Sequence, residues 1–278
     1  MTTLATAAGT LLAAGAATGA LWFTGQSLRA TNAQLGMSQQ TAVTDRFRLA
    51  AEQLASDKIN IKLSGIYLLE RLAKDSPPDH ATVYAVLAAF VRTQAPVTSC
   101  DTQQAAPIDI QAALTAIGDQ DTQAWLEGKT DLNRTCLASA DLVRADLNHA
   151  DLFGANLFGA DLTNANLTKA NLTDAKLEYT SLPFTGLAYT SLVRANLSNA
   201  YLTNADLTKA DLFGANLTDA NLEYANLTDA NLTDANLNHA NLTGANLNHA
   251  NLTGANLTGI EYGERTQWPR GFTPPPSR

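Results

Sequence analysis

Cysteine and histidine are scarce in this chain, which has two of the former and four of the latter among 278 residues. Two cysteines are too few for a disulfide framework or a zinc site, so we interpret Cys100 and Cys136 as reduced thiols. The sequence also contains no Ser/His/Asp order, no P-loop and no glycine-rich dinucleotide motif. We therefore predict that the chain is not an enzyme, with no catalytic residues, no metal site and no cofactor.

Charge is absent from the N-terminal stretch 1–28, where no Asp, Glu, Lys or Arg occurs. An apolar helix of about 20 residues is long enough to cross a bilayer, and Trp22 and Phe23 lie where an interfacial aromatic belt would form. Residues 1–28 are therefore predicted to be a transmembrane anchor. A cleaved secretory signal peptide is the alternative, although such peptides begin with basic residues and none precedes this run.

Two further predictions concern this N-terminal segment. Arg29, Arg46 and Arg48 follow it, and the positive-inside rule then places the C-terminal bulk of a single-pass cell-membrane protein in the cytoplasm. Gly15 and Gly19 form a GxxxG spacing, which lets two transmembrane helices approach closely and predicts a homodimer contact. The alternative is that a segment rich in Ala and Gly produces this spacing by chance.

What the chain has in abundance is a five-residue repeat between positions 130 and 259. Leucine occurs at 132 and at every fifth position to 257, which makes 26 leucines without exception. The residue two before each leucine is Ala or Thr, and the residue directly before it is Asn 13 times and Asp seven times. Ala140-Asp141-Leu142 and Ala225-Asn226-Leu227 are examples.

A period of five fits neither regular element. Successive leucines would drift around an α-helix, whose period is about 3.6, and would alternate between the faces of a flat strand, whose period is about 2. A chain that turns a corner after every five residues places every Leu and every Ala in the interior. Such fixed-period repetition indicates a solenoid, in which each unit buries its apolar face only by stacking on its neighbours.

These repeats resemble those of pentapeptide-repeat proteins over residues 130–259. The resemblance implies a mainly β fold, a right-handed quadrilateral β-helix with four repeats per coil. At roughly 4.8 Å per coil, about six and a half coils would make a solenoid about 30 Å tall. Since four repeats would then form a coil, His149, His239 and His249 would lie on opposite faces or several coils apart, too far to share a metal ion.

Residues 29–129 are predicted to be an α-helical leader that ends in an N-terminal cap. Apolar residues at helical spacing indicate three helices before Pro96 and a fourth from Pro107 to Gly118. Residues 119–129 are interpreted as the cap, because an open solenoid end exposes unpaired backbone groups. Stretches such as Leu63-Ser-Gly-Ile-Tyr-Leu-Leu-Glu-Arg-Leu72 are similar to the leader of membrane-anchored pentapeptide-repeat proteins of actinobacteria.

Residues 260–278 are predicted to be a C-terminal cap with a disordered tail. Trp268 and Phe272 are large enough to cover the last coil, and the run Pro274-Pro-Pro276 follows them. The ending Thr-x-Trp-Pro-x-Gly-Phe is likewise similar to actinobacterial members of the family.

The repeat departs from its pattern at residues 176–191. There Lys, Ser and Gly replace Asn or Asp before the leucines, and Thr replaces Ala. Tyr179, Phe184 and Tyr189 each lie two residues after a leucine and would form an aromatic belt over three successive faces, a candidate contact for a protein partner. The alternative is neutral drift or a small bend in the solenoid.

Acidic residues are concentrated on the solenoid. Residues 130–260 contain 13 acidic and 6 basic side chains, a net charge of −7, against −8 for the whole chain. This balance argues against direct nucleic-acid binding, which uses clusters of Lys and Arg.

We therefore predict a non-enzymatic, membrane-anchored scaffold or protein-interaction module with an unidentified protein partner. The alternative is a DNA mimic that regulates a type II topoisomerase such as gyrase, as some pentapeptide-repeat proteins do. The neutral Asn before every leucine from Leu217 to Leu257 argues against that alternative.

Overall fold

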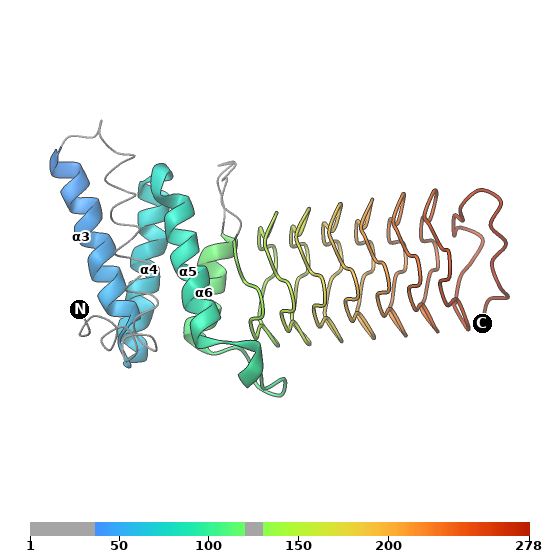
Figure 1. Cartoon of the computed structure of the whole chain (residues 1–278), viewed down its shortest axis with the longest axis horizontal. Helices are drawn as coiled ribbons and strands as arrows, with labels where there is room; N and C mark the ends of the chain where they lie inside the picture. Colours follow the sequence, from blue (N-terminus) through green and yellow to red (C-terminus); the bar gives the residue numbers. More distant parts are fainter. Residues whose placement is uncertain (1–36, 120–129) are drawn as a thin grey trace, which may run out of the picture. The chain divides into compact units, whose positions relative to one another are not determined.

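The computed structural model of the chain describes residues 37–119 and 130–278 (Figure 1). The predicted anchor over residues 1–28, including Gly15 and Gly19, lies outside this part of the chain. No helix among the described residues is both long and apolar enough to span a membrane.

The chain divides into two compact units. Among the described residues, one unit contains 37–94 together with 107–119 and Thr130, and the other contains Ala95–Ala106 together with Asp131–Arg278. The second unit therefore includes a short segment that precedes the last helix in the sequence.

The first unit is helical, as the apolar spacing predicts. Its helices are α3 (Met37–Leu54), α4 (Ile59–Asp75), α5 (His80–Gln94) and α6 (Ile108–Gly118), with the 3-10 turn η1 (Pro77–Asp79) between α4 and α5. Helix α4 packs against α3, α5 and α6 (Figure 1).

Small and apolar residues of α4 allow it to pack closely against the neighbouring helices. A Cβ at Gly65 would lie 2.8 Å from the carbonyl oxygen of Ala50 in α3, so only glycine allows the two helices to approach this far. Ile66 and Leu69 of α4 are fully buried. The largely buried side chain of Lys62 places its ammonium 3.3 Å from Asp109 of α6 and 5.9 Å from the centre of the Phe90 ring.

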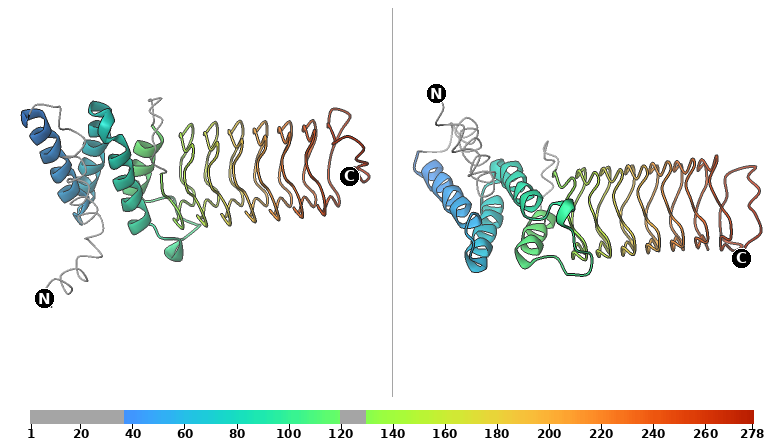
Figure 2. Two further views of the ribbon diagram at one scale, coloured as in Figure 1. Left: turned by 45° about the horizontal axis from the view of Figure 1, so that its top comes forward. Right: turned by 60° about the horizontal axis from the view of Figure 1, so that its bottom comes forward.

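The second unit is a β-helix whose stacked coils are joined by regularly spaced bridges (Figures 1 and 2). Parallel bridges join Asp131 to Asp151, and the pattern continues to Asn236 and Asn256. Each bridge is an isolated pair, because the chain turns a corner before a longer strand can form. Bridged residues are four repeats apart in the sequence, so each coil holds four repeats and the β-helix prediction is confirmed for this unit.

The hydrogen bonds of a single repeat show why five residues suffice for each face. The N–H of Leu172 donates to the carbonyl of Ser191 in the next coil at 2.7 Å, and that of Asn171 donates to Ala150 in the preceding coil at 2.9 Å. The N–H of Ala175 donates back to the carbonyl of Leu172 at 3.1 Å and closes the corner. Polar backbone groups are thus satisfied both between coils and within each turn.

The corner of each repeat requires a left-handed backbone. The residue two after each leucine has a φ of about +60°, for example +59° at Asn164 and +60° at Gly154. Gly, Asn and Asp adopt this conformation readily, whereas a bulky side chain does so at a cost of roughly 1–2 kcal/mol. The corner is therefore a position where the fold prefers small or short polar residues.

Three threonines of the irregular stretch 176–191 have an interior role that the sequence pattern does not reveal. Thr180, Thr185 and Thr190 are fully buried in the positions that alanine occupies elsewhere. Their hydroxyls donate to leucine carbonyls of the preceding coil at 3.0, 2.8 and 2.7 Å, respectively. The irregular stretch at 176–191 therefore keeps the coil closed with side-chain hydrogen bonds.

A strap covers part of the first coil, and we define it as Ala95–Cys100. Cys136 donates its N–H to the carbonyl of Ala95 at 2.7 Å, and the N–H of Val97 donates to the carbonyl of Arg134 at 2.7 Å. The 3-10 turn η2 (Val97–Ser99) follows this antiparallel contact. Sequence reasoning placed the cap at residues 119–129, most of which lie outside the described residues, and missed the strap.

The two cysteines form a disulfide, so the expectation of two reduced thiols is wrong. Cys100 at the end of the strap is bonded to Cys136 in the first coil, with their Cα atoms 5.2 Å apart. The strap brings together two residues that are separated by 36 positions in the sequence. The two cysteines are close only because of the tertiary structure, so their spacing in the sequence does not predict the disulfide.

The C-terminal segment continues the β-helix and then covers it. Glu261 and Gln267 form bridges with Asn241 and Asn246, and the hydroxyl of Thr266 donates to the carbonyl of Leu242 at 2.9 Å. These contacts extend the pairing pattern beyond the last leucine of the repeat.

The proline-rich tail differs from the disordered tail that we predict from the sequence. The hydroxyl of Tyr262 donates to the carbonyl of Pro275 at 2.8 Å, and the N–H of Arg278 donates to Ile260 at 3.0 Å. Trp268 stacks on Phe272 with ring centres 5.4 Å apart and meets Tyr262 edge-on at 5.3 Å. The tail thus folds back onto the cap.

Candidate functional site: an exposed aromatic face of the β-helix

The three residues of the predicted aromatic belt are exposed, but they do not lie on one common surface. Tyr179, Phe184 and Tyr189 have exposed fractions of 53%, 61% and 53%. They belong to successive five-residue repeats and therefore lie on three different faces of a coil that closes after four repeats. A flat partner cannot contact all three residues together.

Two of these three rings already have neighbours on adjacent coils. Tyr179 packs against Phe158 with ring centres 5.4 Å apart. The ammonium of Lys209 lies 5.4 Å from the centre of the Tyr189 ring. Phe184 has no ring or cation neighbour among the described residues, and it is the most exposed of the three.

Phe184 shares its face with two tyrosines that sequence reasoning missed. Tyr201 and Tyr224 lie on the next two coils of this face and have exposed fractions of 55% and 46%. Bridges between Ser181, Tyr201 and Asn221 fix this register. We name Phe184, Tyr201 and Tyr224 the aromatic face. The signal that would have found it is the period of the coils, which is four repeats, rather than the five-residue period of a single repeat.

The backbone beneath the aromatic face is held by hydrogen bonds on both sides. The N–H of Phe184 donates to Thr203 at 3.1 Å, and the N–H of Tyr201 donates to Thr180 at 2.9 Å. The N–H of Tyr224 donates to Thr243 at 2.9 Å. The three rings therefore project from a rigid scaffold, which reduces the entropy lost on binding.

Glycine makes room for one ring of this face. Gly244 follows Tyr224 by one coil, and a Cβ at Gly244 would lie 2.5 Å from the Cδ1 and Cε1 atoms of that ring. The Tyr224 ring therefore lies along the face, over the next coil, instead of projecting straight into solvent.

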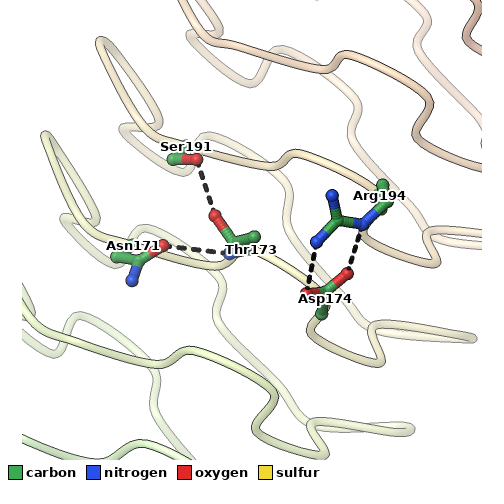
Figure 3. Close-up of polar contacts among 5 residues, drawn as sticks. All are labelled: Asn171, Thr173, Asp174, Ser191 and Arg194. Atoms are coloured by element: carbon green, nitrogen blue, oxygen red, sulfur yellow. Dashed lines mark hydrogen bonds and ion pairs between the residues drawn. The ribbon is translucent and has the colours of Figure 1, made fainter.

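Charged side chains on another face of the β-helix are paired within the chain (Figure 3). Arg194 donates from Nε and Nη2 to the two carboxylate oxygens of Asp174, at 2.8 and 2.7 Å. These hydrogen bonds hold the pKa of Asp174 below its usual value and raise that of Arg194. Nearby, the hydroxyls of Thr173 and Ser191 lie 2.8 Å apart across two coils.

The aromatic face also contains charged side chains. Its repeats contain Asp141, Asp161, Glu223 and the single cation Arg144. Glu223 is next to Tyr224 and forms no ion pair among the described residues. This face therefore combines exposed rings with an excess of negative charge.

The described residues contain no group of three or more His, Cys, Asp or Glu side chains placed to hold a metal ion. In the helical unit, Lys74 binds Glu70 and Asp119, both at 2.8 Å, and these hydrogen bonds raise the pKa of Lys74. Lys74 is an exposed ion-paired residue, which is a surface arrangement of small energetic weight.

Comparison with known families matches residues 155–185, 187–219 and 220–259 to the model of pentapeptide repeats, in eight copies. A comparison with curated proteins finds no match.

Solved structures of related sequence include two from cyanobacteria. One is HetL, a pentapeptide repeat protein involved in heterocyst differentiation regulation from Nostoc sp. strain PCC 7120. HetL is 34% identical to this chain, with a TM-score of 0.31. The match covers 49% of this chain and 65% of HetL, so the chain spans just under two thirds of HetL. The pentapeptide repeat protein alr5209 from Nostoc PCC 7120 is 34% identical over 39% of this chain and 77% of its own length, with a TM-score of 0.29.

A more distant match is QnrB1, a plasmid-mediated fluoroquinolone resistance protein. It is 16% identical, and the match covers 45% of this chain and 81% of QnrB1 with a TM-score of 0.25.

Proposed function

Because the chain belongs to the pentapeptide-repeat family, we propose that its right-handed β-helix is a non-enzymatic protein-interaction module that binds its partner through the aromatic face. The observation that carries this proposal is the presence of three exposed rings on adjacent coils of one face, held on a rigid scaffold. Large exposed aromatic side chains are enriched where proteins bind one another and are rare on surfaces that remain solvated.

We further propose that residues 1–28 anchor this module to a membrane, with Gly15 and Gly19 as a dimer contact between two anchors. The uncharged N-terminal run supports the anchor, and the GxxxG spacing supports the dimer. If the dimer depends on these glycines, Gly15→Leu/Gly19→Leu should convert a detergent-resistant dimer of the full chain to monomer. An unchanged dimer would contradict this contact.

The disulfide favours the outer side of the membrane for the β-helix. Positive residues after the anchor predict a cytoplasmic location, whereas a disulfide between the only two cysteines of the chain is typical of oxidising compartments. We give the disulfide more weight, since three scattered arginines are a weak orientation signal. A maleimide-polymer label added to denatured cell extract should modify the protein only after reduction. Labelling without reduction would indicate the cytoplasmic side.

Photo-cross-linking in cells tests the interaction module directly. A photoreactive phenylalanine analogue at Phe184 or Tyr201 should yield a cross-linked protein adduct. The same analogue at Phe213 is the matched control, because Phe213 is 42% exposed but lies on another face of the β-helix. Equal adducts at the two faces, or none at either, would contradict the proposal.

Regulation of a topoisomerase is the alternative function, and a gyrase supercoiling assay distinguishes it. The acidic charge of the β-helix is the observation in its favour. Duplex DNA carries about one charge per 1.7 Å, or roughly 18 over 30 Å, which far exceeds the net charge of this β-helix. We expect no inhibition by the full chain. Inhibition at low molar excess would favour DNA mimicry over the proposed module.

A further inference from the structure

The β-helix uses its own aromatic rings as platforms for cations on faces other than the aromatic face. The guanidinium of Arg134 lies 5.7 Å from the centre of the Phe153 ring, and the ammonium of Lys209 lies 5.4 Å from that of Tyr189. In both pairs the cation and the ring belong to adjacent coils. A ring on this scaffold is thus well placed to accept a cation that lies above a neighbouring coil.

The rings of the aromatic face have no such internal cation. Among the described residues, Phe184, Tyr201 and Tyr224 have neither a cation nor another ring in contact. The only basic residue in the repeats of this face is Arg144, two coils before Phe184. The faces of these three rings are available to cations from outside the chain.

The fold itself does not explain why aromatic residues occupy these positions. Phe184 and Tyr224 have φ values of +57° and +56°, a conformation that favours Gly, Asn or Asp over bulky side chains. Tyr201 replaces the Asn or Asp that usually accepts a local hydrogen bond, as Asn221 does from the N–H of Glu223 at 3.0 Å. Tyr179 and Tyr189 have the same left-handed backbone, so the cost of this conformation is common to the corners of the β-helix and is not particular to the aromatic face.

The charge of this face selects the kind of partner. Three carboxylates and one arginine give its repeats a net charge of −2, and the unpaired Glu223 lies beside Tyr224. A carboxylate next to an exposed ring attracts a cationic side chain and repels an anionic one. The face is therefore complementary to basic groups and unsuited to phosphates.

We propose that the aromatic face binds a basic protein segment, with arginine or lysine side chains placed over Phe184, Tyr201 and Tyr224. The carboxylate of Glu223 pairs with one of these cations at the edge of the face. This inference rests on the proposed function and specifies the chemistry of the partner. An exposed cation–π contact changes affinity by roughly 2- to 5-fold, so three contacts together correspond to about tenfold or more.

Binding of fluorescent octa-arginine to the purified full chain tests this chemistry. The triple variant Phe184→Ala/Tyr201→Ala/Tyr224→Ala removes the aromatic face, and Tyr179→Ala/Tyr189→Ala/Phe213→Ala removes three exposed rings from the other faces. Both variants keep the net charge of the wild type. We expect at least a tenfold loss of affinity in the first and less than a threefold loss in the second, with similar melting temperatures.

A third variant keeps every ring of the face. Gly244→Ala introduces a Cβ where the Tyr224 ring now lies and so forces that ring to move. We expect a two- to fivefold loss of octa-arginine affinity. Affinity equal to that of the wild type would show that the position of Tyr224 does not matter for binding and would contradict its assigned contact.

The outcomes separate this inference from the proposed function. Equal losses in the two triple variants would show that general charge attraction, and not the aromatic face, binds the basic probe. If octa-arginine binding did not depend on the rings while Phe184 and Tyr201 still gave cross-linked protein in cells, the interaction module would stand and the basic partner would be rejected. Ring-dependent binding of a neutral chito-oligosaccharide, without ring-dependent binding of octa-arginine, would indicate a glycan ligand and overturn the inference.

Discussion

Reduction of the Cys100–Cys136 disulfide should release the strap while leaving the distant coils intact. The two cysteines are separated by 36 positions. A chain-entropy treatment of a loop of this length gives about 13 cal/mol/K, or about 3.8 kcal/mol at 25 °C, in favour of the closed state. In the closed state, the N–H groups of Val97 and Cys136 are held at 2.7 Å from their acceptors. The disulfide therefore stabilises the hydrogen bonds that cover the first coil.

Hydrogen exchange measured with and without reductant tests this magnitude. About 3.8 kcal/mol corresponds to several hundredfold in the opening equilibrium, so exchange at Val97 and Cys136 should accelerate by up to that factor. Leu217 is the internal control, because its N–H is bonded to Asn236 at 2.7 Å, far along the β-helix from the strap. A Cys100→Ser/Cys136→Ser variant should behave like the reduced protein. Unchanged exchange at Val97 and Cys136 after reduction would show that the disulfide does not hold the strap on the first coil.

Three further predictions concern the interior and surface of the β-helix. Leu217→Ala should lower the free energy of unfolding by about 2–5 kcal/mol in urea denaturation, since it leaves a cavity in a packed column; a loss below about 1 kcal/mol would contradict that packing. Thr185→Ala should lower the free energy of unfolding by only about 1 kcal/mol in the same assay, because the carbonyl of Leu162 still accepts a hydrogen bond from the N–H of Ala165 at 2.9 Å. A loss as large as that of Leu217→Ala would contradict this limited role of the threonine hydroxyl. The hydrogen bond with Arg194 lowers the pKa of Asp174 in the folded protein below its ordinary value of 3.8. The pair therefore stabilises the fold above pH 3.8, and this stabilisation is lost as the pH falls through the pKa of Asp174 in the folded protein. The melting temperatures of wild type and Asp174→Asn should therefore converge in acid, and a constant difference would contradict the pairing.

The architecture of the second unit could be predicted because one physical constraint is repeated in every unit. A leucine at every fifth position can be buried throughout only if the chain turns a corner in each repeat. Fully buried residues such as Leu157 and Leu227 show that the structure meets this constraint. Helices in the first unit were predictable for a related reason, since Leu69 and Leu72 fall on one side of a helix and are buried there.

The ends of the β-helix were less predictable because their contacts join residues that the repeat does not relate. Ala95 pairs with Cys136, and Arg278 returns to Ile260, through backbone groups that every residue possesses. Composition carries no signal for such contacts. The proline content of the tail indicated disorder, yet prolines also favour the extended path by which the tail reaches Tyr262.

The sequence predicted that exposed aromatic residues form the candidate site, but it did not predict which of them share one face of the β-helix. Tyr179, Phe184 and Tyr189 attract attention because they are adjacent in the five-residue pattern, but adjacency in that pattern places them on different faces. Tyr224 lies two residues after a leucine, as Phe184 does, but it comes eight repeats later, and Tyr201 directly precedes a leucine. Their common face becomes evident only from the register of the bridges between coils.

Oxidative footprinting of the protein in isolated membranes, compared with the purified full chain, tests whether the aromatic face binds a partner. Hydroxyl radicals modify exposed aromatic side chains, and Tyr179 serves as an exposed control within the same molecule. We expect Phe184, Tyr201 and Tyr224 to be protected in membranes relative to the purified protein, and Tyr179 to be modified equally in both. Equal modification of all four residues in the two preparations would contradict the assignment of the aromatic face as the partner-binding surface.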